Sequence, residues 1–331
     1  MPTTRQFLYV RAPDGMPDPG CFELVTRPMP QPTEGQVLVR VLYLSMDPYF
    51  RRQMAGAHGY RDGLKPGAVM IGRGIGEVVE SRFAGLAPGD VVLGETGWRE
   101  HAALDGAALK KIDPSIEPLS LYLGLLGQSG GTAGIGLFDI ANLQAGETML
   151  VSAAAGAVGS AAGQIAKILG CRAIGVAGGN DKCRHVVDDL GFDACLDYKA
   201  GDLHGQISRA VPEGIDVYFD NVGGEVLDAV LPHLNMQARI AVCGMISQYN
   251  AASPTGIRNI GAVLDKCAVI QGFRVGLYLP QRDAALVKLT QWYREGRLTY
   301  RETVAEGLES APTAFINMLE GRNLGKQVVC L

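Results

Sequence analysis

The sequence predicts an α/β protein that combines a doubly wound parallel sheet with a second, β-rich domain. Two patterns support this fold class. In the middle of the chain, short apolar strands alternate with amphipathic helices, the order that builds a parallel sheet. The first third instead has strands punctuated by glycine and proline turns, which is typical of a barrel or sandwich. A length of 331 residues suits about two domains.

The N-terminal third contains the first strand candidates. Residues 36–43 are rich in β-formers and follow a Pro-Thr-Glu-Gly turn. Residues 71–81 form another candidate, in which alternate glycines indicate bends or bulges. A Pro-Gly-Asp turn then leads into a strand at residues 91–93.

Further along the chain, strands and helices alternate. Strands are expected at residues 147–152, 171–176, 194–197, 215–219, 239–243 and 268–273. A helix should follow the first of these and stop at Gly170, and another should run from an Asn180 cap to a stop at Gly191. The remaining expected elements are a helix at 226–234, a strand at 299–303 and a helix at 311–320.

Composition and charge narrow the functional classes. Apolar residues make up 47% of the chain and charged residues 19%, which excludes disorder as the main state. The 34 acidic and 30 basic side chains leave a net charge of −4, which argues against nucleic-acid or anionic-membrane partners. The uncharged runs at 118–138 and 148–166 hold too many glycines and polar residues for membrane spans. With seven cysteines, no CxxC pair and no signal-peptide pattern, we expect reduced thiols in a cytoplasmic protein.

A glycine-rich turn joins the expected strand at 147–152 to the next helix. It follows the G-x-G-x-x-G dinucleotide fingerprint, with Ala154 at the first position, then Gly156 and Gly159, and with Ala157 and Val158 between them. Gly156 would let the backbone approach a pyrophosphate, and Gly159 would allow close packing of helix on strand. The helix N-terminus offers N–H groups and a positive dipole end to the anion. We therefore predict a dinucleotide site; the alternative is a purely structural glycine-rich crossover.

The strand expected at 171–176, which follows this helix, indicates which dinucleotide binds. An NAD site places an acidic side chain at the tip of that strand, whereas this tip continues into Gly178 with no carboxylate. Asp181 falls later, where an acid is favourable in a first helical turn. Lys182 lies in the same turn and offers positive charge to a 2′-phosphate, although alone it would be an ordinary surface lysine. The sequence favours NADP(H).

Other catalytic chemistries find little support. Five histidines, no cysteine cluster with zinc spacing and no HExxH motif argue against a zinc site. There is no G-x-S-x-G elbow, so a hydrolase triad has no basis. Without a metal, a substrate oxygen would be polarised by hydroxyls, amides or the cofactor's own ribose.

Five motifs occur together and in order: Met46–Arg51, Ser152–Ser160, Phe219–Gly224, Cys243–Asn250 and Asn323–Lys326. With them, the whole chain resembles the zinc-independent branch of the medium-chain dehydrogenase/reductase superfamily, in particular its prostaglandin, alkenal double-bond and curcumin reductases. In zinc alcohol dehydrogenases of the superfamily a Gly-His-Glu stands near Ile71–Gly74, and its absence here agrees with a metal-free site.

The resemblance implies a domain organisation and a reaction. Residues 1–125 and 298–331 would form a GroES-like substrate domain, and residues 126–297 a Rossmann domain that binds NADP(H). The reaction would be NADPH-dependent reduction of the C=C bond of an α,β-unsaturated ketone or aldehyde. Relatives are often dimers, so a homodimer is expected by analogy alone.

The resemblance also assigns site residues. Lys182 and Tyr198 match contacts to the 2′-phosphate, Tyr249 matches a tyrosine that faces the substrate, and Tyr49 would approach from the other domain. The other residues implied to line the cofactor are Gly178, Asn221, Cys243, Gly244, Ser247, Phe273, Val275 and Asn323. We expect Cys243 to be a buried filler rather than a nucleophile.

The implied mechanism requires one main hydrogen-bond donor. Hydride transfer to the β-carbon leaves negative charge on the carbonyl oxygen, and a donor aimed at that oxygen lowers the barrier. Tyr249 is the first candidate and a ribose hydroxyl is the other, while the α-carbon receives a proton from water or a tyrosine. Tyr249 could instead pack on the cofactor, and Tyr49 could belong to a core-lining turn. A quinone reductase of the same superfamily and a non-catalytic NADPH-binding protein remain as alternatives.

Overall fold

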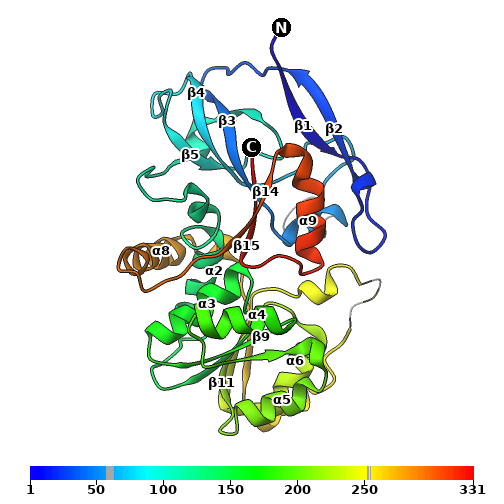
Figure 1. Ribbon diagram of the computed structural model, residues 1–331, viewed down its shortest axis with the longest axis vertical. Helices are drawn as coiled ribbons and strands as arrows, with labels where there is room; N and C mark the ends of the chain where they lie inside the picture. The colour runs from blue at the N-terminus through cyan, green and yellow to red at the C-terminus, as the bar shows by residue number, and fades with distance from the viewer. Residues whose placement is uncertain (57–62, 252, 254) are drawn as a thin grey trace. The chain divides into compact units, whose positions relative to one another are not determined.

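The computed structural model describes residues 1–56, 63–251, 253 and 255–331. The chain divides into two compact units (Figure 1). The β-rich unit comprises Met1–Leu123 and Glu302–Leu331, and the parallel-sheet unit comprises Gly124–Arg301. Each unit is described by itself below.

The β-rich unit is built on a sheet that the C-terminus completes, antiparallel except for the parallel pairing of its last two strands. Its strands are β1 (Thr3–Tyr9), β2 (Phe22–Pro28), β3 (Gln36–Ser45), β4 (Gly74–Ser81), β5 (Val91–Gly94), β6 (His101–Asp105), β7 (Lys110–Lys111), β14 (Glu302–Glu306) and β15 (Lys326–Cys330). The sheet order is β14-β15-β3-β4-β5-β7, with β6 paired to β3, while β1 and β2 form a separate hairpin. Figure 1 shows β15, in red, beside the blue β3, and the two strands pair antiparallel.

An aromatic core fills the β-rich unit. Trp98 is fully buried and stacks on Phe22 with ring centroids 5.3 Å apart. Phe315, from helix α9 (Ala311–Leu319), packs against Trp98 at 5.9 Å, and Phe50, from α1 (Tyr49–Met54), packs against both rings. Helix α1 is therefore anchored by its second residue in the centre of this core.

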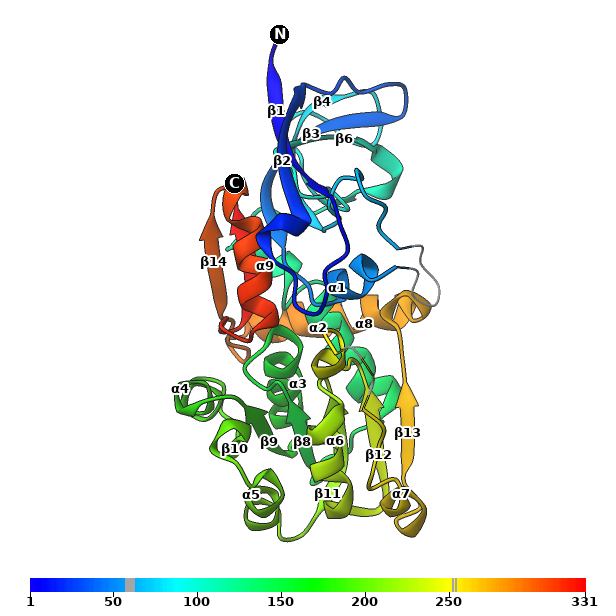
Figure 2. The same cartoon turned by 90° about the vertical axis from the view of Figure 1, so that its right-hand side faces the viewer.

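The parallel-sheet unit confirms the fold class that the sequence predicts. Its strands are β8 (Thr148–Ser152), β9 (Arg172–Ala177), β10 (Ala194–Asp197), β11 (Ile215–Asp220), β12 (Leu234–Val242) and β13 (Val269–Gly272). They pair in the order β10-β9-β8-β11-β12-β13, and all the pairings are parallel. Figure 2 shows this order across the sheet. Because the chain starts in the middle at β8 and winds outward in both directions, the sheet is doubly wound.

Helices cover both faces of that sheet. They are α2 (Gln128–Ile135), α3 (Ala157–Ile168), α4 (Asn180–Arg184), α5 (Leu203–Ala210), α6 (Gly224–Val230), α7 (Gly261–Asp265) and α8 (Leu279–Arg294). Apolar side chains of α5 and α6, such as Ile207 and Leu227, pack on Leu150 and Tyr218 of the sheet. On the other side, α2 contacts α3 and α8, and α3 contacts β8 and β9. In the described part of the chain, none of the helices has the length and apolar character needed to cross a bilayer.

Two helix boundaries differ from the sequence prediction for identifiable reasons. The residue before α4 is Gly179, at φ +97°, so Asn180 is the first helical residue rather than the cap. The helix expected at 226–234 ends its α-helical part at Val230, because Pro232 has no N–H to donate to the preceding turn. Leu234 already belongs to β12, where it pairs with Ile215.

Three strands also begin at other residues than expected. The strand expected at 239–243 begins at Leu234, and the strand expected at 71–81 begins at Gly74. The strand expected at 299–303 begins only at Glu302, because Thr299 is bonded through its N–H and its carbonyl to the side chain of Gln164 on α3. That pair of hydrogen bonds attaches residue 299 to the parallel-sheet unit.

Candidate functional site

The fingerprint turn leaves the carboxyl end of β8, in the middle of the sheet. Ala153 adopts a left-handed conformation at φ +52°, and its carbonyl accepts the N–H of Gly156 at 2.9 Å. Ala154 is fully buried, and its N–H donates to the carbonyl of Val176 on β9 at 3.0 Å. The turn is thereby held to both strands that flank the helix.

The two glycines of the turn meet different constraints. A Cβ on Gly159 would lie 2.2 Å from the carbonyl oxygen of Ala153 and 2.9 Å from the Cα of Ala154, both backbone atoms that cannot move aside. A Cβ on Gly156 would lie 3.2 Å from the same oxygen and would otherwise meet open space. Gly159 is therefore required by packing, whereas Gly156 keeps the approach to the helix clear.

The N-terminus of α3 fits an anion. Gly156 is its N-cap, and no side chain in the described part of the chain makes a capping hydrogen bond there. Ala157 and Val158, both partly exposed, form its first turn. The helix thus presents backbone N–H groups and a positive dipole end, the arrangement that binds pyrophosphate in dinucleotide folds.

The carboxyl end of β9 carries a cluster of cationic and phenolic groups. The Tyr198 ring covers Gly178 so closely that a Cβ there would lie 2.7 Å from the ring. Lys182 is half-buried in the first turn of α4; burial lowers its pKa, and the nearby positive charge of Lys199 lowers it further. The two lysines and the phenol fit a 2′-phosphate dianion. The dianion would favour the charged forms of the lysines, and the phenol could donate a hydrogen bond to it.

One carboxylate in this cluster was not identified from the sequence. Asp197 ends β10, and its Oδ1 accepts the N–H groups of Gly179 at 2.7 Å and of Lys199 at 2.9 Å. The side chain therefore ties the tip of β9 to the segment that carries Tyr198. The position of Asp197 at the end of an expected strand was the available signal, but its backbone partners could not be read from the chain order.

A buried network lies at the carboxyl end of β11, beside the fingerprint turn. The Asn221 side chain donates to the carbonyl of Ser152 at 2.7 Å, and the Asn221 N–H donates to the Ser152 hydroxyl at 2.9 Å. The carboxylate of Asp220, fully buried, accepts a hydrogen bond from the Ser152 hydroxyl at 3.1 Å. Asp220 appeared in the sequence only as a member of a motif, with no role of its own.

The loop after β12 folds back onto this network. The N–H groups of Cys243 and Gly244 donate to the carbonyl of Asp220 at 2.8 and 3.1 Å. The Ser247 hydroxyl donates to the carbonyl of Val222 at 2.6 Å. The Tyr249 phenol accepts the N–H of Met245 at 3.3 Å, and a Cβ on Gly244 would lie 3.3 Å from the phenol oxygen. The phenol of Tyr249 therefore lies against the start of its own loop, next to Gly244.

Burial raises the pKa of the Cys243 thiol to about 12, and the negative charge of Asp220 contributes. A thiol with this pKa is protonated near neutral pH, so it is a poor nucleophile.

Two further predicted residues follow β13. Phe273 lies edge-on to Phe219 at the end of β11, with ring centroids 6.3 Å apart, and Val275 is buried. With them, the predicted site residues of the parallel-sheet unit all lie at the carboxyl edge of its sheet.

Tyr49 and Asn323 belong to the β-rich unit, where Lys326 connects their segments. The buried Lys326 ammonium donates to the carbonyl of Met46 at 2.6 Å and to the Asp47 carboxylate at 2.8 Å. Tyr49 begins α1 with its ring 4.7 Å from that of Phe50, and the Asn323 amide donates to the carbonyl of Gly325 at 2.8 Å. The first and last of the five motifs are thus joined, while the contacts assigned to Tyr49 and Asn323 stay predictions.

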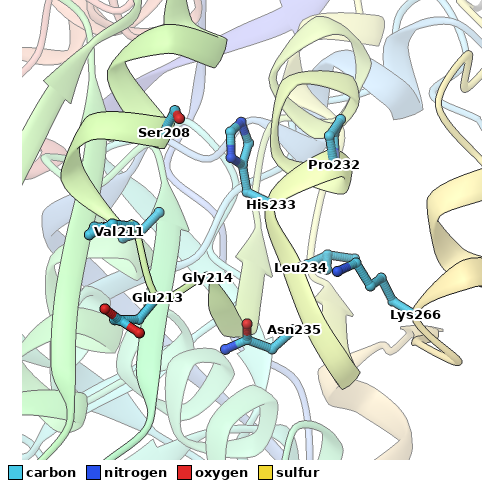
Figure 3. A pocket seen from close by; sticks show the side chains of 10 residues that line it. Ser208, Val211, Glu213, Gly214, Pro232, His233, Leu234, Asn235 and Lys266 are labelled. Carbon is cyan, nitrogen blue, oxygen red and sulfur yellow. The ribbon is translucent and has the colours of Figure 1, made fainter.

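A cavity of about 370 Å³ lies at the opposite, amino edge of the parallel sheet (Figure 3). Its lining residues are Ser208, Val211, Pro212, Glu213, Gly214, Pro232, His233, Leu234, Asn235 and Lys266, none of which was a predicted site residue. In the ranges that the structure describes, no group of three or more His, Cys, Asp or Glu side chains is arranged to hold a metal ion.

Known proteins match the chain over nearly its whole length. A family described as "N-terminal domain of oxidoreductase" matches residues 5–112, and one described as "Zinc-binding dehydrogenase" matches residues 157–291. The NADPH-dependent curcumin reductase of Escherichia coli (strain K12) is 44% identical over 98% of this chain and 96% of its own. The 2-alkenal reductase (NADP(+)-dependent) of Nicotiana tabacum is 43% identical over 88% of this chain and 86% of its own.

A solved structure agrees with these relatives. The crystal structure of CurA in complex with NADPH from Vibrio vulnificus has a TM-score of 0.94, at 43% identity and 98% coverage of both chains. The chain therefore belongs to the medium-chain dehydrogenase/reductase superfamily, as the five motifs indicated. Within the superfamily it falls in the group of curcumin, alkenal and prostaglandin reductases.

Proposed function

We propose that this protein catalyses the NADPH-dependent reduction of the C=C bond of α,β-unsaturated ketones or aldehydes. The observation that carries this proposal is the nearly full-length similarity to a curcumin reductase and a 2-alkenal reductase, both NADP(H)-dependent. The geometry at the carboxyl edge of the parallel sheet supports it, because a helix N-terminus capped only by a glycine and a pair of lysines suit the two anionic parts of NADPH.

The residues that would hold the cofactor follow from that geometry. Gly156, Ala157 and Val158 would face the pyrophosphate with their backbone, and Lys182 and Tyr198 would contact the 2′-phosphate. The remaining cofactor-lining residues are proposed to be Ala154, Gly159, Gly178, Asn221, Cys243, Gly244, Ser247, Tyr249, Phe273, Val275 and Asn323. NADPH held by these residues would provide the hydride for the β-carbon of the enone, and the carbonyl oxygen of the substrate would then take up negative charge.

Two tyrosines are the proposed catalytic residues. The Tyr249 hydroxyl would donate a hydrogen bond to the carbonyl oxygen, where it binds the developing charge more strongly than the neutral carbonyl. Tyr49 would contact the substrate from the β-rich unit. A proton from a tyrosine or from water would then reach the α-carbon and complete the saturated product.

The function is tested by following the near-ultraviolet absorbance of NADPH with an enone, an enal, a quinone and a saturated aldehyde. We expect oxidation with the enone and the enal, with a product saturated at the former double bond. Turnover of the quinone alone would replace this proposal with a quinone reductase. Absence of oxidation with all four compounds would favour a non-catalytic NADPH-binding protein.

Lys182→Ala tests the choice of cofactor. Loss of one charged contact to the 2′-phosphate is expected to weaken NADPH binding about 10- to 100-fold and to leave NADH binding unchanged. Titration of each cofactor against the purified variant measures both constants. The matched control is Lys266→Ala, at the amino edge of the same sheet. Equal weakening of NADPH and NADH by Lys182→Ala would contradict the assignment.

A homodimeric, cytoplasmic form is also proposed, on the family resemblance alone. Sedimentation equilibrium of the purified chain would show a mass twice that of the monomer. A monomer over the whole concentration range would reject the dimer.

A further inference from the structure

We propose that Asp220 is a positioning residue for the reduction of the enone: its buried carboxylate joins two of the loops that carry the candidate site, and its backbone carbonyl holds the third. This inference rests on the proposed function for its effect on turnover, but the contacts that support it belong to the parallel-sheet unit alone.

Asp220 concentrates hydrogen bonds on one oxygen atom. Its Oδ1 accepts from the Tyr218 hydroxyl at 2.8 Å, from the Ser152 hydroxyl at 3.1 Å, and from the N–H groups of Val222 and Gly223, both at 2.9 Å. The residue is 0% exposed, and its other oxygen, Oδ2, has no hydrogen-bond partner in the described part of the chain. Burial raises the pKa of Asp220, and the two backbone donors oppose that change most strongly.

These bonds connect loops that are distant in the sequence. Through Ser152, Asp220 reaches the fingerprint turn, and the same hydroxyl accepts the N–H of Asn221. Through Val222 and Gly223, it shapes the turn before α6, where Gly223 has φ +66°. Its own carbonyl accepts the first two N–H groups of the loop at 243–249. One residue therefore contacts all three segments at the carboxyl edge.

The connection extends to Tyr249 in two steps. The carbonyl of Asn221 accepts the N–H of Ile246, and the carbonyl of Val222 accepts the N–H and the hydroxyl of Ser247. These bonds fix the short 3-10 turn that precedes Tyr249. Any change in the turn held by Asp220 is therefore transmitted to the phenol that we propose as the donor. A displacement of about 1 Å in such a group costs on the order of 100-fold in rate.

Asp220→Asn tests this role, with Asp216→Asn as the matched control. Asparagine keeps the size of the side chain, but its amide nitrogen must replace one of the two carboxylate oxygens. In place of Oδ1 it would face the N–H groups of Val222 and Gly223, and in place of Oδ2 it would have no acceptor in the described part of the chain. Asp216 lies in the same strand, at its amino end, and its carboxylate likewise bonds to β8 and to the start of β12, through Thr148 at 2.9 Å and Asn235 at 2.8 Å. Both variants lose a carboxylate that ties β11 to its neighbours, but only one lies at the site.

We expect Asp220→Asn to lower kcat with an enone by about 10- to 100-fold and to raise the KM for NADPH by a smaller factor, because the same loops carry proposed cofactor-lining residues. Hydrogen exchange without cofactor should become faster at residues 221–224 and 243–249. Asp216→Asn should lower the Tm without these changes. Wild-type exchange at both segments in Asp220→Asn, or an equal loss of kcat in Asp216→Asn, would overturn the proposal.

A second variant keeps the test decisive if Asp220→Asn does not fold. Ser152→Ala removes the hydroxyl that links Asp220 to the N–H of Asn221, and faster exchange at Asn221 is expected. Wild-type exchange there would overturn the inference. If the wild-type protein fails to oxidise NADPH with any enone, the proposed function fails, whereas the exchange results still decide whether Asp220 organises the loops.

Discussion

Gly159→Ala is expected to destabilise the protein and to abolish NADPH binding. The new Cβ would lie 2.2 Å from the carbonyl oxygen of Ala153, so either the turn or the first turn of α3 must move. Ala153 is itself in a left-handed conformation, at φ +52°, which leaves the turn little freedom to adjust. Overpacking of this kind costs about 1–3 kcal/mol, and each kcal/mol lowers the Tm by about 2–4 °C in a domain of this size. Thermal unfolding and NADPH titration measure the two effects.

Gly156→Ala is the matched control, because the same methyl group enters the same turn. Its Cβ would lie 3.2 Å from the carbonyl of Ala153, a contact that a shift of a few tenths of an ångström relieves. We therefore expect a Tm near that of the wild type. NADPH affinity should still fall, since the methyl group stands at the N-cap where a pyrophosphate would approach. Equal Tm losses in the two variants would refute the distinction between a packing glycine and a binding glycine.

The sheet of the parallel unit was predictable because its strands are buried and separated by clear signals. The strand expected at 194–197 coincides with β10, the one expected at 147–152 differs from β8 by one residue at its start, and the one expected at 171–176 differs from β9 by one residue at each end. Runs of apolar residues between glycine turns are sufficient to place such strands. The observed order, β10-β9-β8-β11-β12-β13, is the one that doubly wound dinucleotide-binding sheets adopt.

The misplaced elements depended on contacts made far along the chain. Strand β14 starts later than expected because the side chain of Gln164, more than a hundred residues earlier, forms hydrogen bonds with the backbone of Thr299. Asn180 has the chemistry of a helix cap, but Gly179 takes that position. The N–H of Gly179 itself is held by the carboxylate of Asp197, at the end of the next strand. Local propensity cannot report such partners.

The candidate site shows the same division. Residues with a backbone or charge signature, such as Gly156 and Lys182, are predicted as site residues by the pattern and the family motifs. Asp220 and Asp197 are not, since an acidic residue at a strand end is common and its meaning depends on which N–H groups face it. In the structure each carboxylate bonds the turn that follows its own strand and also a group on another strand, the N–H of Gly179 for Asp197 and the hydroxyl of Ser152 for Asp220. Only the folded arrangement supplies the partners on the other strands.

Tyr249→Phe is expected to lower turnover while the cofactor still binds. If the phenol donates to the developing enolate oxygen, its removal should reduce kcat on the order of 10²- to 10³-fold, the cost of losing one donor at an oxyanion site. NADPH affinity should stay within about twofold, because the ring that would contact the cofactor is retained. The phenol also accepts the N–H of Met245 at 3.3 Å, a long bond to an exposed residue, so we expect little change in Tm.

Tyr122→Phe serves as the control, since its phenol donates to the carbonyl of Asp113 in the β-rich unit and it is not a proposed site residue. It should leave kcat unchanged. Single-turnover measurements with saturating NADPH separate the chemical step from product release. Unchanged turnover in Tyr249→Phe would assign the donor role to the ribose hydroxyl or to Tyr49. A parallel Tyr49→Phe variant distinguishes these two, because it loses rate only if Tyr49 is the donor. A loss of NADPH affinity as large as the loss of kcat would instead mean that Tyr249 packs on the cofactor, with no part in stabilising the enolate.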